Sequence, residues 1–251
     1  MGERSGVRVR ADGLALRGSQ GWVLTGVTFD ARPGDLVSVL AGGGSGRTSL
    51  LLVLGGRMRA TSGTASVDGL PLPRRARQVQ RISALGEMQT VNELDDAVTV
   101  GAHIAERAHL VGRFAGRRTI DDALHRVGLD LDRRTLVREL DTFDRRLLGV
   151  ALALMGDPRL ILVDDADDRL TADVRPVMWE RLAAVAESGP TVVAAGTDAP
   201  PSGLAATEVR LGTGSPGWSA APRTDEETSE EAETGEARLD DLLGPGEEGA
   251  R

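Results

Sequence analysis

Residues 36–54 constrain the fold of this chain more than any other stretch of its sequence. The stretch begins with an apolar, partly β-branched run at 36–40, typical of a buried strand, and ends with an apolar run at 50–54 that has helical spacing. Between the two runs, residues 42–46 contain four glycines, and Arg47 and two hydroxyl residues follow. Glycines let a backbone approach a ligand closely, and the N–H groups at a helix N-terminus favour an anion. The stretch therefore predicts a strand, a phosphate-binding loop and a helix.

The loop is similar to the P-loop pattern G-x-x-x-x-G-K-[ST]. Here the pattern reads AGGGSGRT, so that Ala41 replaces the first glycine and Arg47 replaces the lysine. Arg47 keeps the positive charge on a longer, forked side chain, and since all 30 basic residues of the chain are arginine, composition offers a cause for this exchange. We expect Thr48 to hold Mg²⁺. The residues expected to bind phosphate are Gly42, Gly43, Gly44, Ser45, Gly46, Arg47, Thr48 and Ser49. A glycine-rich turn without a ligand is the alternative.

Composition and charge exclude several classes of protein. With 251 residues, 40% of them hydrophobic and 27% charged, the chain can form one large or two modest globular domains. No apolar run approaches the roughly 20 residues that span a bilayer. We expect no secretory leader, and the absence of cysteine fits a cytosolic location.

The net charge of −8 lies in residues 212–251, which hold eleven Asp/Glu and three Arg, so residues 1–211 are neutral overall. This neutrality argues against nucleic acid or a membrane surface as a direct partner. Because residues 212–251 are rich in Gly, Ser, Pro and Glu and poor in apolar residues, we expect them to form a disordered acidic tail.

The order of the expected elements indicates an α/β fold. Glycine-interrupted alternation at 7–31 predicts short antiparallel strands, and the pattern from 99 to about 145 is helical. The other expected strands are at 36–40, 64–67, 82–85, 160–163, 191–195 and 208–211, and the other expected helices are at 145–155 and 174–186. Strands that alternate with helices predict a mainly parallel sheet, here with a helical insertion.

This order of elements resembles the nucleotide-binding subunit of an ATP-binding cassette (ABC) transporter over residues 7–211. The resemblance implies a P-loop NTPase fold of the ABC ATPase type, with a mainly parallel core sheet, an N-terminal antiparallel β-subdomain and a helical subdomain inserted at about 99–145. It places one nucleotide-binding domain at 1–211, before the acidic tail at 212–251. An unrelated P-loop kinase or GTPase is disfavoured, because a GTPase needs an N-K-x-D motif and the chain has no lysine.

The family's Walker B motif falls on the apolar run 160–163 followed by Asp164 and Asp165. The resemblance implies that Asp164 binds Mg²⁺ through a water molecule. Asp165 stands where the family has the glutamate that polarises the attacking water, and its side chain is about 1.5 Å shorter. Since a misplacement of about 1 Å can cost on the order of 10²-fold in rate, we expect slow hydrolysis.

Other family motifs are altered as well. Glu87 occupies the position of the family's glutamine loop, where it either contacts the metal or is a solvated loop residue. Thr197 occupies the position of the switch histidine. The signature L-S-G-G-Q falls on 140–144, where only Leu140 remains, and we expect that this loop does not bind nucleotide in a second subunit. No aromatic residue lies at the adenine-stacking position near Arg17, although Trp22 either substitutes for it or packs in the core.

These matches predict an ATP-binding subunit of an ABC-type transporter or a related membrane complex. It would bind Mg·ATP and hydrolyse it weakly or only with a partner, with Asp165, Glu87 and Thr197 as the catalytic residues. The alternative is a non-hydrolysing nucleotide sensor or structural subunit docked on a membrane protein. The resemblance further implies an integral membrane partner encoded separately, a homodimer or a heterodimer with another ABC subunit, and a cytoplasmic place at the inner face of the cell membrane.

Overall fold

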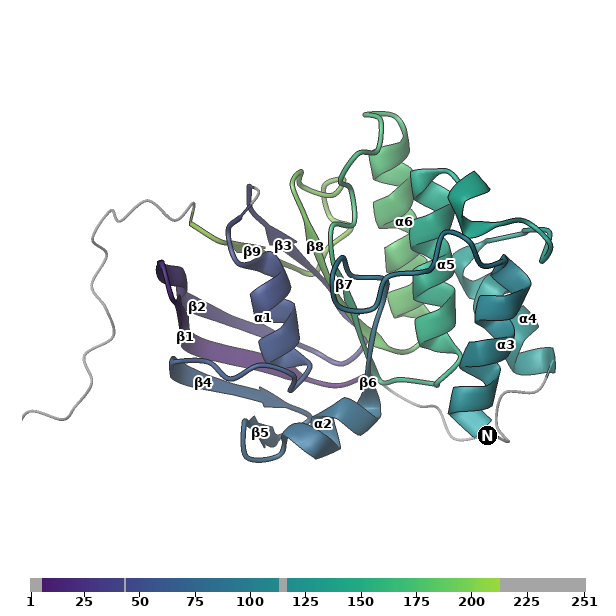
Figure 1. Cartoon of the computed structure of the whole chain (residues 1–251). Helices are drawn as coiled ribbons and strands as arrows, with labels where there is room; N and C mark the ends of the chain where they lie inside the picture. Colours follow the sequence, from purple (N-terminus) through teal and green to yellow (C-terminus); the bar gives the residue numbers. More distant parts are fainter. Residues whose placement is uncertain (1–5, 43, 113–116, 213–251) are drawn as a thin grey trace, which may run out of the picture.

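The chain folds around two sheets that lie at an angle to each other (Figure 1). The computed structural model describes residues 6–42, 44–112 and 117–212. A four-stranded antiparallel sheet has the order β2-β1-β4-β5, and a five-stranded parallel sheet has the order β6-β7-β8-β3-β9. The strands are β1 Val9–Gly18, β2 Gly21–Ala31, β3 Leu36–Leu40, β4 Ser62–Val67, β5 Leu70–Leu72, β6 Ser83–Leu85, β7 Leu160–Val163, β8 Thr191–Gly196 and β9 Thr207–Arg210.

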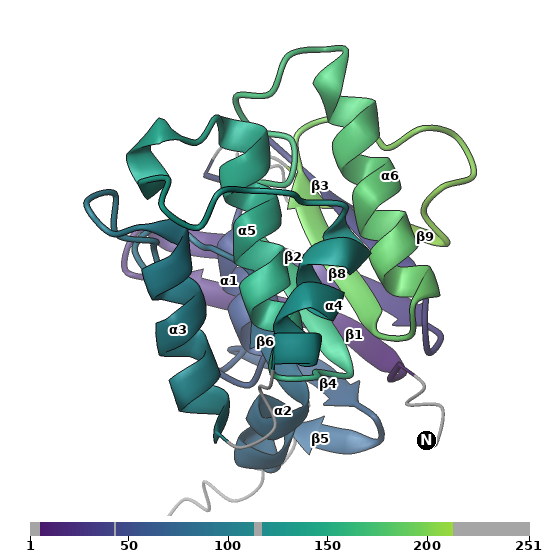
Figure 2. The ribbon, with the colours of Figure 1, turned by 90° about the vertical axis from the view of Figure 1, so that its right-hand side faces the viewer.

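Helices cover the parallel sheet and extend beyond it (Figure 2). They are α1 Arg47–Leu54, α2 Ala76–Ile82, α3 Val100–Val111, α4 Arg117–Val127, α5 Thr142–Leu154 and α6 Val174–Glu187, with a short 3₁₀ helix at Val137–Glu139. No helix in the described ranges is long and apolar enough to cross a bilayer.

The parallel sheet has an apolar layer on each face. Strands β3, β7 and β8 are buried along their whole length, which matches their nearly continuous apolar sequences. Alternate residues face opposite sides of a strand. One face packs on α1 and the antiparallel sheet, through Val37, Val39, Leu160, Leu162, Val193 and Ala195. The opposite face packs on α5 and α6, through Leu36, Leu40, Ile161, Val163, Val192 and Ala194.

The antiparallel strands β1 and β2 are long and irregular, where the sequence predicted short strands separated by glycines. Gly13 (φ 58°) and Gly26 (φ 66°) lie inside these strands. The β1–β2 register shifts between Ala11 and Leu14. Glycine at positive φ lets a strand accommodate such a bulge and continue.

The basic segment before β6 forms a helix that the sequence did not predict. Residues Ala76–Ile82 form α2, whose Val79 is buried in the core around α1 and the antiparallel sheet. With one fully buried position, α2 has little amphipathic pattern to detect. The predicted α/β architecture is nevertheless confirmed, with a parallel sheet, an antiparallel sheet and additional helices.

Leu162 on β7 lies in the apolar layer between the parallel sheet and α1, so shortening its side chain should destabilise the protein. Leu162→Ala should lower the free energy of unfolding by about 2–5 kcal/mol, because the side chain is fully buried. Leu110→Ala is the matched control, since Leu110 is 70% exposed on α3 and the same truncation should change stability by less than about 0.5 kcal/mol. Urea denaturation followed by circular dichroism measures both. Equal effects of the two substitutions would contradict this account of the core.

Candidate functional site

The predicted site residues lie on loops that leave one edge of the parallel sheet. All five strands of that sheet are parallel, so the loops at their carboxyl ends meet at the same edge. The loop after β3 contains residues 41–46, Glu87 follows β6, Asp164 and Asp165 follow β7, and Thr197 follows β8. In open α/β sheets, ligands bind outside the carboxyl ends of the strands.

The glycine-rich loop ends directly in the first turn of α1. Gly46 is the N-cap of α1 in the left-handed conformation (φ 83°), and no side chain caps this helix. A Cβ on Gly46 would lie 2.7 Å from Cγ1 of Val23, so only glycine lets the loop pass β2. Because the first N–H groups of a helix lack partners within the helix, the uncapped start of α1 can receive an anion.

Other predicted loop residues have different surroundings. Ser45 is buried, and its Oγ has no hydrogen-bond partner among the described residues. A buried hydroxyl without a partner is costly, so this atom fits a polar ligand. Gly42 and Gly44 lie in the loop and Ser49 lies in the first turn of α1, while the prediction for Gly43 falls outside the described residues.

Arg47 is held by the protein itself. Its side chain, 10% exposed, forms an ion pair with Asp165 (Nη2 to Oδ1, 2.9 Å) and donates a hydrogen bond to the carbonyl oxygen of Ala41 (2.9 Å). The guanidinium therefore joins the glycine-rich loop to the loop after β7. A phosphate that bound Arg47 would have to compete with this carboxylate.

Thr48 and Asp164 form the second link between the same two loops. The Thr48 hydroxyl donates a hydrogen bond to Oδ2 of Asp164, and the N–H of Asp165 donates to Oδ1 (3.0 Å). Burial raises the pKa of the Asp164 carboxyl, although the hydrogen bond from Thr48 acts in the opposite direction. A cation beside Asp164 would favour its ionised form.

The oxygen atoms of Thr48 and Asp164 are donors of the kind that Mg²⁺ accepts. The described residues contain no group of three or more His, Cys, Asp or Glu arranged to hold a metal ion. Protein Mg²⁺ sites commonly use one or two carboxylates and complete their shell with water and phosphate oxygens. This pair therefore fits a phosphate-bound Mg²⁺ better than a metal enclosed by protein.

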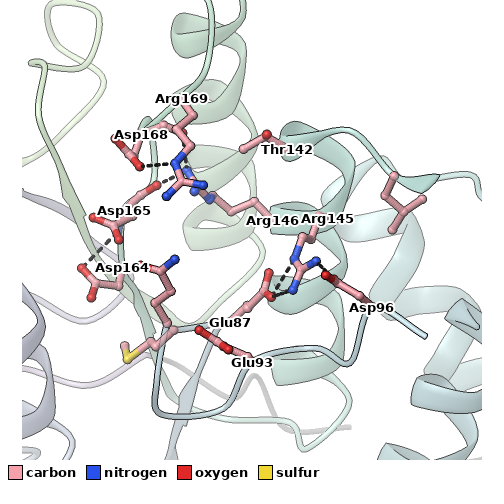
Figure 3. A pocket seen from close by; sticks show the side chains of 13 residues that line it. Glu87, Glu93, Asp96, Thr142, Arg145, Arg146, Asp164, Asp165, Asp168 and Arg169 are labelled. Atoms are coloured by element: carbon pink, nitrogen blue, oxygen red, sulfur yellow. Dashed lines mark hydrogen bonds and ion pairs between the residues drawn. The ribbon is translucent and has the colours of Figure 1, made fainter. Parts of the chain in front are cut away.

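Glu87 is fixed by an ion pair from α5 (Figure 3). Oε1 of Glu87 lies 2.7 Å from Nη2 of Arg145 and accepts a hydrogen bond from the N–H of Leu94 (3.2 Å). Arg145 also pairs with Asp96 and donates to the carbonyl oxygen of Leu94 (2.9 Å). The alternative of a solvated loop residue is therefore wrong. Sequence reasoning missed Arg145, whose only signal was a charged pair at the start of an otherwise apolar helix.

A partly buried arginine and a buried aspartate, both missed by sequence reasoning, hold the loops in place. Arg146 on α5 donates to the carbonyl oxygens of Asp165 and Asp168, and burial lowers the pKa of its guanidinium. Asp167 is fully buried and accepts from the N–H groups of Thr197 and Asp198, each at 2.7 Å. The place of Asp167 in the acidic run 164–168 gave no sign of this burial.

Glu87, Asp164 and Asp165 line one cavity of about 420 Å³, while Thr197 does not (Figure 3). None of the described residues of the glycine-rich loop lines this cavity, which thus lies beside that loop. The carboxylates at its wall are those of Glu87, Glu93, Asp96, Asp164, Asp165 and Asp168, against three arginines, Arg145, Arg146 and Arg169. A highly charged anion would enter such a cavity more easily with a cation.

The region predicted to match the signature motif serves as the start of α5. Asp141 caps the helix by accepting a hydrogen bond from the N–H of Asp144 (2.8 Å), and Phe143 packs against the core. Burial, with repulsion from Asp141, raises the pKa of the Asp144 carboxyl.

Trp22 lies on β2, next to the residue that contacts Gly46 of the glycine-rich loop. The side chain is 43% exposed, so the alternative that Trp22 packs in the core is wrong. The Arg17 guanidinium lies 5.9 Å from its ring centroid.

The comparisons with known proteins agree with this geometry. A family model described as ABC transporter matches residues 24–168. Nod factor export ATP-binding protein I of Burkholderia pseudomallei (strain 1710b) is 30% identical over 173 residues, which cover 68% of this chain and 56% of that protein. The chain belongs to the ABC transporter family. It spans about half the length of the curated relatives it matches.

Solved structures show the same fold at lower identity. The structure of cbiO1 from Clostridium perfringens, part of the ABC transporter complex cbiONQ, has a TM-score of 0.68 and 18% identity, covering 81% of this chain and 84% of that one. The ATP-binding cassette MJ0796 with bound ADP and Pi has a TM-score of 0.66 and 20% identity, covering 81% and 94%.

The buried Asp164 carboxylate should destabilise the ligand-free protein at neutral pH. Because its pKa is raised in the folded state, Asp164→Asn should raise Tm, by about 2–4 °C for each 1 kcal/mol gained. The gain should be complete above the raised pKa and vanish as pH falls below about 3.9, the usual value in an unfolded chain. Thermal unfolding measured across pH tests this. Asp130→Asn, on an exposed side chain, is the control, and an equal response of both variants would contradict the prediction.

The Arg145 contacts should determine how rigidly residues 86–96 are held. Arg145→Met should leave the Glu87 carboxylate without its cation and loosen this loop. Amide hydrogen exchange of peptides over 86–96 should accelerate by about tenfold for each 1.4 kcal/mol of local stability lost. Arg138→Met provides the control, since Arg138 is exposed and has no ion pair among the described residues. Unchanged exchange at 86–96 in Arg145→Met would refute this role.

Proposed function

We propose that the chain is the ATP-binding subunit of an ABC-type transporter or a related membrane complex, which binds Mg·ATP at its glycine-rich loop and hydrolyses it weakly or only with a partner. The observation that carries this proposal is the link between Thr48 and Asp164, which joins the uncapped start of α1 to the end of β7. Family membership also supports this proposal, as do the names of the relatives, which are ATP-binding proteins.

Phosphate oxygens would be received by the loop and by the first turn of α1, from Gly42 to Ser49. The unpartnered hydroxyl of Ser45 supports this assignment, as do the N–H groups at the uncapped helix start. The exposed face of Trp22, next to the residue that contacts Gly46, supplies a surface on which the base could stack.

Mg²⁺ would be held by Thr48 and, through water, by Asp164. When bound, the ion neutralises charge on the phosphate oxygens. The carboxylate-rich wall of the neighbouring cavity supports this assignment, because it would repel a nucleotide that came without a cation.

Hydrolysis would depend on Asp165, Glu87 and Thr197, and we propose that it is slow. Asp165 would polarise the attacking water, but its carboxylate is short and already paired with Arg47. Glu87 is neutralised by Arg145. Thr197 donates its hydroxyl to Asp167 (3.2 Å), so its orientation is set by that contact. These restraints act on one reaction, so their effects on the rate would combine.

The second candidate is a subunit that binds nucleotide without hydrolysing it and serves as a sensor or structural part of a membrane complex. The ion pair between Arg47 and Asp165 favours it, because this pair occupies both the phosphate cation and the acid that would activate water.

The partners and location follow from the same family. cbiO1 is described as part of a transporter complex, and MJ0796 as a dimeric cassette. We propose that this chain works with an integral membrane protein encoded separately and pairs as a homodimer or with another ABC subunit. It would lie in the cytoplasm at the inner face of the cell membrane, without nucleic acid as a partner. The proposed domain is 1–211, with a helical insertion at about 99–145 and an acidic tail at 212–251.

Calorimetric titration with ATP and Mg²⁺ tests the proposal. Thr48→Ala and Arg47→Ala should weaken binding at least tenfold each, which corresponds to about 1.4 kcal/mol. Thr64→Ala and Arg138→Ala, at exposed positions on β4 and in the 3₁₀ helix, are matched controls that should bind as the parent does. No binding by the parent protein at millimolar nucleotide would overturn the proposal.

Phosphate release measured on the same proteins separates the two candidates. Slow release that Asp165→Asn abolishes, while binding is kept, supports the hydrolysing subunit. Binding without any release supports the sensor or structural subunit.

A further inference from the structure

Six arginines gather on one surface formed by the end of α1 and by α2. We call this surface the arginine face; its members are Arg57, Arg59, Arg74, Arg75, Arg77 and Arg81, all exposed residues, although the guanidinium of Arg57 is partly buried. The two parts are in contact, since Gln80 on α2 donates a hydrogen bond to the carbonyl oxygen of Gly56 (2.6 Å) and Arg57 donates to Oγ of Ser83 (3.2 Å). α2 lies beside β4 and β5 at one end of the molecule (Figures 1 and 2).

The folded body does not neutralise this surface. Asp68 is the only acidic residue in 55–86, and it is already paired with Arg159. Within the described ranges, Arg59 and the four arginines at 74–81 form no ion pair. Among the described residues, some arginines elsewhere do so, as Arg8 does with Asp30 and Arg175 with Asp198, while others, such as Arg138, do not. The arginine face therefore carries unbalanced positive charge that an anionic group can meet.

The same chain holds a matching segment of opposite charge. Residues 225–248 contain eleven Asp/Glu and one Arg, and 212–222 form an uncharged stretch rich in Gly, Ser and Pro. We propose that the acidic segment 225–248 docks on the arginine face of its own chain. This inference is independent of nucleotide binding.

The length of the connecting stretch permits this contact. The last described residue, Gly212, follows β9, and the twelve residues 213–224 can span about 40 Å when extended. A compact body of about 200 residues has a radius of gyration of about 17 Å, and the path over its surface to the opposite side is about 67 Å. The extended connecting stretch therefore covers more than half of that path, and the acidic segment itself, which is longer, can cover the remainder.

Because the acidic segment is covalently attached through residues 213–224, its binding to the arginine face is favoured over that of a separate polyanion. Single exposed ion pairs are weak, but a tethered segment is present at an effective concentration of about millimolar or above. Several weak Arg–carboxylate contacts can then form together. An anionic lipid surface or another copy of the chain would have to displace the chain's own acidic segment, so docking would keep other anions away from the arginine face.

Paramagnetic relaxation in the full chain tests the proposal. Because the chain has no cysteine, Ser229→Cys gives one position for a nitroxide label inside the acidic segment. With ¹⁵N-labelled protein at about 0.1 M salt, the amide signals of 74–82 should broaden. They should recover at about 1 M salt, where the Debye length falls from about 10 Å to about 3 Å.

The matched variants separate a specific contact from general attraction. Arg74→Gln/Arg75→Gln/Arg77→Gln should abolish the broadening. Arg32→Gln/Arg134→Gln/Arg138→Gln removes the same charge from exposed arginines that have no ion pair in the described ranges, and it should leave the broadening in place. Broadening that is absent at 74–82, or that is unchanged by the first set, would overturn the proposal.

Two further measurements test whether another molecule, and not the chain's own acidic segment, binds the arginine face. Spin-labelled ¹⁴N protein mixed with unlabelled ¹⁵N protein reports contact between copies, and broadening only in that mixture would overturn docking within one chain. Vesicles of phosphatidylserine report lipid binding. If they bind through 74–82 while the label causes no broadening there, the face belongs to a membrane and the proposal fails.

Discussion

The hydrogen bond from the Thr48 hydroxyl to the Asp164 carboxylate connects the two halves of the site, and much of the surrounding structure depends on it. A carboxylate as deeply buried as Asp164 is costly unless polar partners compensate. Thr48 is that partner, and it lies two residues after Gly46, which starts α1 in a left-handed conformation beside Val23. The order of the parallel sheet then matters, since β8 lies between β3 and β7 and sets the spacing of the two loops. The position of the Thr48 hydroxyl thus depends on the conformation of the glycine-rich loop, on where α1 begins and on the strand order of the parallel sheet.

Arginine and aspartate side chains hold the remaining loops against this centre. Arg145 and Arg146, adjacent on α5, fix Glu87 and the carbonyl groups of the loop after β7. Asp167 does the same for the start of the loop after β8. Gly149 belongs to this arrangement, because a Cβ there would lie 2.7 Å from the backbone nitrogen of Glu87. Residues 86–96 and α5 are therefore packed as one unit.

The sequence was sufficient for the fold class and the family, and insufficient for the contacts inside the site. Apolar runs such as 160–163 predicted buried strands correctly, because burial on both faces leaves a continuous apolar pattern. The exposure of Trp22 and the burial of Asp167 were not predictable, since each depends on elements distant in sequence. The same holds for Glu87, whose partner Arg145 is 58 residues away. The assignment of nucleotide-binding, catalytic and metal-binding residues stays a prediction.

The ion pair between Arg47 and Asp165 would compete with a phosphate group for Arg47, if the proposed nucleotide site is correct. Any phosphate that reaches Arg47 exchanges with a carboxylate that is covalently part of the protein and cannot diffuse away. The apparent affinity then equals the intrinsic affinity multiplied by the fraction of molecules in which the pair is open. A weak measured affinity for nucleotide would thus reflect the strength of the Arg47–Asp165 ion pair as well as the contacts between the loop and phosphate.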